Sequence, residues 1–157
     1  MPPTALFHSH GLKKKGAMEP LDLSKRPPRS PKLELDGLTM LPRTIDKIRA
    51  TLPGGNLGPY RIAGFSQRML DAIRVTEQQL RDAVAGAKSD EDVAAWLRQH
   101  ANTNAYSEFS SYIENRSLKD LEDPAAFAKR YPIVERRPDL HYLADVLEAD
   151  DAEMFPS

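Results

Sequence analysis

Cysteine is absent from the 157-residue sequence, which excludes disulfide bonds, thiolate nucleophiles and every cysteine-ligated metal or iron–sulfur site. No uncharged apolar run approaches the roughly 18 to 20 residues that a membrane-spanning helix needs. Aromatic residues make up only 7% of the chain, which leaves little material for the stacking surfaces that bind single-stranded nucleic acid. These absences predict a cytoplasmic protein that neither spans a membrane nor binds nucleic acid.

The residues that are present suit a single globular domain, with 40% hydrophobic and 29% charged side chains. The net charge of -1 conceals an asymmetry: residues 1–61 hold 11 basic and 5 acidic side chains, a net of +6, and residues 62–157 hold 11 and 18, a net of -7. The basic part could meet an anionic partner or lie across the acidic part of its own fold. We favour the second interpretation, because an isoelectric point near 6.4 is lower than nucleic-acid-binding proteins show.

Proline divides the chain into three segments. Residues 1–17 lack apolar periodicity and are interpreted as a disordered leader, either natural or left from cloning. Six of the 13 prolines fall within residues 1–31, and each restricts the backbone to extended conformations. We therefore expect an extended, Pro-rich arm over residues 18–39. Residues 40–157 are expected to form the helical domain, against which leucines of the arm should pack.

Beyond residue 40 the apolar residues recur at three- and four-residue intervals, which predicts an all-α bundle of six or seven short helices. Pro42 suits the first turn of a helix, and Thr76 with Gln79 matches a capping box. Ser66 and Asp139 are the expected N-caps of two further helices. Only residues 32–38 and 60–65 have the composition of short extended pieces.

Three segments carry a family resemblance: LDLSKRPPRSP at residues 21–31, Gly37-Leu38, and LPRTIDKIRA at residues 41–50. Together they resemble domain-of-unknown-function family 5069, and the similarity extends over about 130 of the 157 residues. Members usually carry a tryptophan shortly before the last apolar helix, where this chain has His141-Tyr142. The resemblance implies a small helical bacterial protein and implies no activity, since none is assigned to the family.

The helix expected from residue 41 carries the strongest candidate binding site, formed by Arg43, Asp46, Lys47 and Arg49. Arg43 and Lys47 are four residues apart on one face and could clamp an anion, with Asp46 holding an arginine in place. Alternatively, Arg43 or Lys47 ties the arm or an acidic helix to the core. We favour the structural alternative for this cluster.

Two weaker patterns carry no site. The glycine-rich stretch at residues 53–60 follows a helix and lacks the Gly-Lys-Ser/Thr of a phosphate-binding loop, so we interpret it as a turn. His141, Asp145 and Glu148 would share one face of a helix and could bind a metal ion, but a solvated helical face accounts for the same residues. We predict no metal and no cofactor.

The sequence therefore favours a non-catalytic binding or interaction module whose partner is a small anion or another protein. The alternative is an enzyme acting on a small anionic metabolite, with Arg43 and Lys47 binding the substrate and Asp46 or His141 transferring protons. An enzyme predicts a concave pocket where these groups converge, whereas a binding module predicts a flat or grooved apolar patch with the charges internally paired. Both a monomer and a homodimer are compatible with the sequence.

Overall fold

The computed structural model describes residues 16–156, and most of the leader expected at residues 1–17 lies outside this range. Within the described range the all-α prediction is confirmed, because a hairpin of two residues per strand is the only sheet there. Eight α-helices are present in that range, one more than the upper bound of six or seven. In chain order the elements are β1 Glu34–Leu35, β2 Leu38–Thr39, α2 Leu41–Ala50, α3 Phe65–Ile73, α4 Glu77–Ala85, α5 Asp90–His100, 3₁₀ helix η1 Thr103–Ala105, α6 Tyr106–Asn115, 3₁₀ helix η2 Leu118–Asp120, α7 Pro124–Arg130, α8 Ile133–Arg136 and α9 Leu143–Met154.

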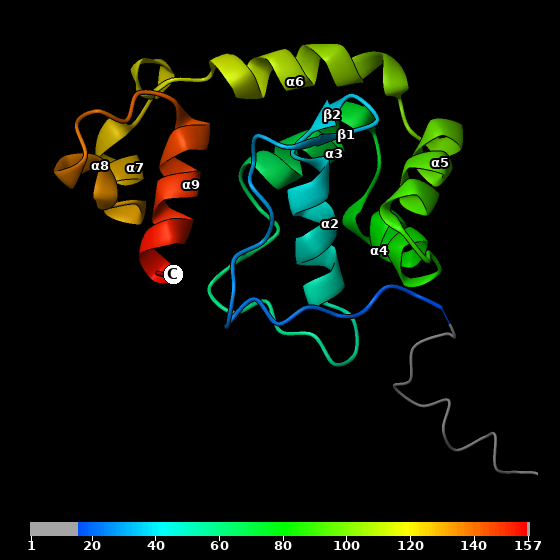
Figure 1. Cartoon of the computed structure of the whole chain (residues 1–157). Coiled ribbons are helices and arrows are strands. Elements are labelled where there is room, and N and C mark those ends of the chain that lie inside the picture. The colour runs from blue at the N-terminus through cyan, green and yellow to red at the C-terminus, as the bar shows by residue number, and fades with distance from the viewer. Residues whose placement is uncertain (1–15, 157) are drawn as a thin grey trace, which may run out of the picture.

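Helix α2 lies at the centre of the larger part of the molecule (Figure 1). Its apolar stripe, which includes Leu41, Ile45 and Ile48, is fully buried, as the three- and four-residue spacing predicts. Helices α3 and α4 and strand β1 pack on α2, and β2 packs under α6. The main hydrophobic core therefore surrounds α2, and α2 is a rigid base for any site built on its polar side chains.

Helices α7, α8 and α9 form a smaller group, which α6 joins to the body along one edge (Figure 1). This group has its own apolar cluster of Ile133, Leu140 and Val146. Its first two helices are separated at Pro132, and the short α8 that follows is the helix the periodicity did not indicate. The space between the α2 body and this C-terminal group is where the pocket described below lies.

The segment before α2 runs along the body and is held by the loop that follows α2. Leu23 is fully buried, and its amide donates a hydrogen bond to Asn56 O at 2.7 Å. Gly58 in the loop has φ +57°, and a Cβ there would lie 2.5 Å from Leu23 O, so only glycine permits this close approach. Leu33, which we expected to pack on the body, is 47% exposed.

Two of the expected helix caps are wrong and one is confirmed. Thr76 and Gln79 form the predicted capping box at the start of α4. Ser66 is not an N-cap, because α3 begins at Phe65; its buried hydroxyl instead lies 2.9 Å from Thr44 Oγ1. Asp139 does not cap α9, since its carboxylate accepts hydrogen bonds from Arg137.

Helices of the described chain are all too short or too polar to cross a bilayer. The longest, α9, has 12 residues, whereas a span needs about 20. Of residues 60–65, a candidate for extended structure, residues 60–64 form a loop instead, and Phe65 is the first residue of α3.

Candidate functional site

Charged side chains on two sides of α2 are buried, which is uncommon for such residues. Arg43, Asp46 and Lys47 expose only 3%, 5% and 8% of their surface. Asp46 is covered where the arm packs on α2, and Arg43 is covered where α9 packs on α2. A buried charge is tolerated when it is paired and hydrogen-bonded, so the partners of each side chain decide its role.

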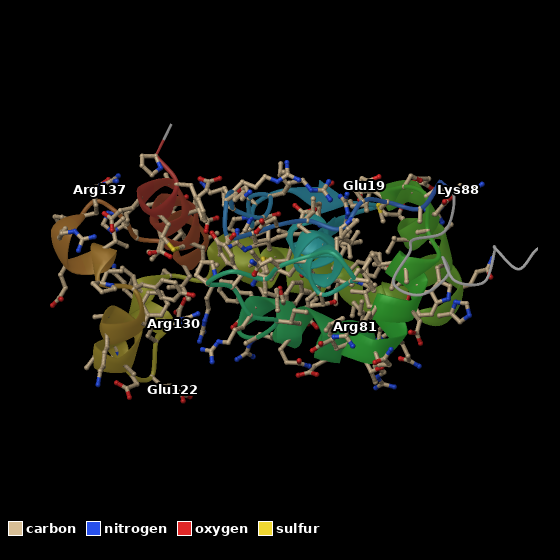
Figure 2. The ribbon with its side chains drawn as sticks, turned by 90° about the horizontal axis from the view of Figure 1, so that it is seen from below. Glu19, Arg81, Lys88, Glu122, Arg130 and Arg137 are labelled. Atoms are coloured by element: carbon tan, nitrogen blue, oxygen red, sulfur yellow. The ribbon has the colours of Figure 1, made fainter. Side chains whose placement is uncertain are left out.

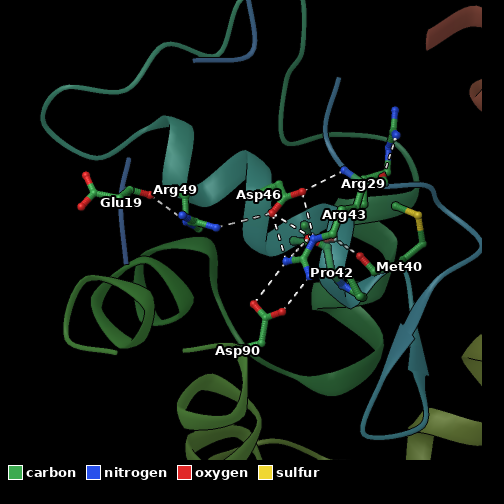
Figure 3. Close-up of polar contacts among 9 residues, drawn as sticks. Glu19, Arg29, Met40, Pro42, Arg43, Asp46, Arg49 and Asp90 are labelled. Atoms are coloured by element: carbon green, nitrogen blue, oxygen red, sulfur yellow. Dashed lines mark hydrogen bonds and ion pairs between the residues drawn. The ribbon is translucent and has the colours of Figure 1, made fainter. Parts of the chain in front are cut away.

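The Asp46 carboxylate is saturated by the arm (Figure 3). It accepts hydrogen bonds from the Arg29 backbone N–H at 2.8 Å and from the Arg29 guanidinium at 3.0–3.2 Å. Arg29 also pairs with Asp90 of α5 at 2.7 Å, and this pair together with Asp46 raises the pKa of Arg29. Arg49 approaches Asp46 only to 4.0 Å and donates to Glu19 O at 2.8 Å. The charges on this side of α2 are consumed within the fold.

Arg43 ties α2 to both the arm and α9. Its guanidinium makes a bidentate pair with Asp151, at 2.7 Å and 3.3 Å, and also donates to Arg29 O at 3.1 Å. The Tyr60 hydroxyl donates to the same carboxylate at 2.7 Å, and the Arg43 guanidinium lies over the Tyr60 ring. Burial and the bond to Asp151 raise the pKa of Tyr60, so this hydroxyl stays protonated and remains a donor.

Lys47 lies one turn further along α2 and has no such partner. Within residues 16–156 no carboxylate lies within ion-pair distance of its ammonium group and no acceptor within hydrogen-bond distance. Burial, with a smaller contribution from Arg43, lowers the pKa of Lys47 from 10.5 to about 7. Asp151 opposes this shift but is already paired with Arg43. Burial therefore favours the uncharged form of the Lys47 amine.

A pocket of about 540 Å³ lies between the α2 body and the C-terminal group, and Lys47 forms part of its wall. Its volume is within the range of small-molecule sites. The loop after α2, α3, α6, α7 and α9 complete the wall. Its cationic side chains are Arg43, Lys47, Arg61, Arg68, Arg116 and Arg130.

Four of these arginines have no carboxylate partner in the described part of the chain. Arg68 and Arg116 both stack on the Tyr112 ring, at 5.2 Å and 5.3 Å from its centre, and Arg130 stacks on Tyr131 at 5.3 Å. Arg130 lies on the inner side of the C-terminal group, away from Arg137 (Figure 2). A stacked guanidinium is held in place while its edge N–H groups stay available for a carboxylate or phosphate.

One carboxylate, Asp150 of α9, lines the pocket, and its pKa is raised by burial and then by Asp151. Aromatic and apolar side chains form the rest of the wall. Phe65 meets Tyr112 edge-on at 6.2 Å, and Phe127 lies 4.9 Å from Tyr131. The pocket thus combines an apolar surface with an excess of positive charge.

The structure divides the four residues predicted as a site. Arg43 and Lys47 line the same pocket, whereas Asp46 and Arg49 do not line it and both contact the arm. The other cations of the pocket were missed because each lies on a different element, so no spacing in the sequence connects them. His141, the alternative proton-transfer residue, is exposed and does not line the pocket.

The weak metal hypothesis for His141, Asp145 and Glu148 has no geometric support. His141 precedes α9, and the two carboxylates pair with Lys32 of the arm. In residues 16–156 no group of three or more histidine and carboxylate side chains is arranged to hold a metal ion. The glycine-rich stretch at residues 53–60 forms the turn that returns the chain to the arm.

Residues 25–153 match the family model of a domain of unknown function, DUF5069. The chain belongs to this family. The DUF5069 region contains all six cationic side chains of the pocket and Asp150. It begins within the arm and ends one residue before the last residue of α9. No curated protein matches the chain.

Proposed function

We propose that this DUF5069 protein binds a small organic anion with an apolar or aromatic body in the pocket between α2 and the C-terminal group. The observation that carries the proposal is the imbalance of charge: besides Arg43, which is paired with Asp151, four arginines and Lys47 line the pocket, against the single carboxylate of Asp150. Such an arrangement is unfavourable without a ligand, because like charges repel. An anion relieves that repulsion.

The chemistry of the pocket also restricts the ligand. Arginine presents paired N–H groups that match a carboxylate or phosphate, and the Phe65, Tyr112 and Phe127 rings supply apolar surface for the remainder of the molecule. A volume of about 540 Å³ holds a metabolite-sized compound. This concave shape supports a small anion over a partner protein, for which a flatter surface is typical.

Catalysis on such an anion is the second candidate, and two observations favour it: Arg43 and Lys47 line one concave pocket, as expected of an enzyme, and burial lowers the pKa of Lys47 there to about 7. Strongly perturbed groups in a concave site are candidates for chemistry. Asp46 is not suited to proton transfer at this site, since its carboxylate is bound by Arg29. Lys47 and Asp150 are the ionisable groups placed for that role.

Fluorescence titration with anilinonaphthalene sulfonate tests the binding proposal, because this probe joins an aromatic body to one anionic group. We expect saturable binding to one site that weakens as salt is added. The uncharged analogue N-phenylnaphthylamine should bind at least about tenfold more weakly, since it forfeits one charge-assisted contact.

Matched arginine variants locate the site. Arg68→Gln and Arg130→Gln should each weaken binding of the sulfonate by about tenfold. Arg26→Gln, which removes an exposed arginine that does not line the pocket, should leave binding unchanged. Equal binding of the charged and uncharged probes, together with unaltered affinity in both pocket variants, would contradict the proposal.

A further inference from the structure

Lys47 is the side chain of the pocket whose placement is not explained by folding or by simple charge attraction. It is more than nine-tenths buried, lines the cavity and is unpartnered in the described chain. Arginine at this position would bind an anion at least as well and would keep its charge. A lysine therefore adds something other than positive charge: an amine that loses its proton.

The surroundings of Lys47 are those that make an amine nucleophilic. Its neighbours are the guanidinium groups of Arg43 and Arg130, which disfavour a second positive charge, and Asp151 is committed to Arg43 and Tyr60. Burial and adjacent cations are the two conditions that activate a lysine towards carbonyl carbon. The arginines around the same cavity would hold the acid group of a ligand.

We propose that Lys47 forms a reversible imine with the carbonyl group of an α-keto acid that bears an apolar or aromatic side chain. The arginines bind the carboxylate, the apolar wall takes the side chain, and the keto carbon then lies within reach of the amine. This inference rests on the proposed anion pocket and adds a covalent step to it.

The step balances without an oxidant or reductant. The Lys47 nitrogen lone pair attacks the keto carbon, a C–N bond forms, and the carbonyl oxygen takes a proton to give a carbinolamine. The hydroxyl group then leaves as water while nitrogen loses its remaining proton, so one ligand and one amine give one imine and one water. Asp150 is the acidic side chain on the pocket wall and can donate the proton that the departing hydroxyl needs.

Reductive trapping tests this inference with phenylpyruvate as the probe. The protein is incubated with phenylpyruvate and cyanoborohydride near pH 7, digested, and analysed by mass spectrometry. We expect one reduced adduct on Lys47, at about tenfold or more above the label on the exposed Lys129. Labelling of Lys47 should rise from about pH 6 to 8 and then level off, while exposed lysines continue to gain label at higher pH.

Two variants and one competitor separate the inference from the proposed function. Lys47→Met should abolish the adduct and still bind hydrocinnamate, which has the same aromatic body and carboxylate without the keto group; Lys129→Gln should keep the adduct. The imine is overturned if hydrocinnamate or phenylpyruvate displaces the fluorescent sulfonate but no adduct is trapped. It is also overturned if the label is spread evenly over exposed lysines. Either result leaves the proposed anion pocket standing. Failure of all three anions to bind overturns both.

Discussion

Asp46 and Lys47 are neighbours in α2, yet they lie in opposite electrostatic surroundings. On the Asp46 side the charges match: the carboxylate receives the Arg29 backbone N–H and guanidinium, and Asp90 takes the remaining edge of that guanidinium. On the Lys47 side the charges do not match, because cations outnumber the single lining carboxylate. Helix α2 separates the two regions.

The difference indicates what each region is for. Paired charges hold the arm to the body, and nothing further is needed to satisfy them. Unpaired charges around a cavity reduce the stability of the fold, and such arrangements are retained where a ligand or reaction uses them. Arg43 stands between the two regions, since it contacts the arm and α9 and also lines the pocket.

Replacing Arg43 should have the largest effect on stability. Arg43→Ala leaves Asp151 buried with only Tyr60 as a partner, and removing one member of a buried pair lowers the free energy of unfolding by roughly 3 to 5 kcal/mol. Urea unfolding measures the loss. The double variant Arg43→Met with Asp151→Leu should recover most of it, and Arg68→Ala, which breaks no ion pair, should lose less than about 1 kcal/mol. A loss below 1 kcal/mol in Arg43→Ala would show that Arg43 is not an anchor.

Replacing Lys47 should increase the free energy of unfolding rather than decrease it. Burial lowers the pKa of Lys47 to about 7 from 10.5, a difference worth at most about 5 kcal/mol, and we expect Lys47→Met to raise the free energy of unfolding by about 3 kcal/mol at pH 7. Below pH 7 Lys47 is protonated in both the folded and the unfolded wild-type chain, so the stability gained by Lys47→Met is at its full value. Between pH 7 and 10.5 only the unfolded chain binds the proton, so wild-type stability rises and the gain shrinks with pH.

Urea unfolding of both proteins at several pH values between 7 and 10 checks this expectation. Relative to Lys47→Met, the wild-type free energy of unfolding should rise by up to about 1.4 kcal/mol for each step of one pH unit. If the difference in free energy of unfolding stays constant over this range, burial does not disfavour the charged form of Lys47. The contrast between the two sides of α2 would then lose its basis.

Part of this arrangement can be predicted from the sequence. The spacing of Leu41, Ile45 and Ile48 with Pro42 is sufficient to predict α2, because helix periodicity and a first-turn proline are local properties. The four-residue interval between Arg43 and Lys47 likewise places both on one face. These inferences need only the geometry of a single helix.

The remainder depends on contacts that spacing does not encode. Asp46 has arginines three residues away on both sides, yet Arg29 binds it, because a backbone N–H and a guanidinium arrive together from the arm. Arg61, Arg68, Arg116 and Arg130 come from a loop, α3, the end of α6 and α7, and converge only when the C-terminal group packs beside the body. The cap expected at Ser66 fails for the same reason, because its hydroxyl pairs with that of Thr44 in another helix.

Weakening the contact between Asp46 and Arg29 should change the free energy of unfolding least of the three substitutions. Asp46→Asn keeps an acceptor for the Arg29 N–H and removes the charge opposite its guanidinium, so we expect a loss of about 2 kcal/mol in the free energy of unfolding. Hydrogen exchange at the Arg29 amide should accelerate, because that bond weakens locally. Lys32→Ala, which removes an exposed pair with Asp145 and Glu148, should lose less than 1 kcal/mol and leave the Arg29 amide protected. Equal losses in both variants would mean that the matched side of α2 holds the arm no better than a surface ion pair does.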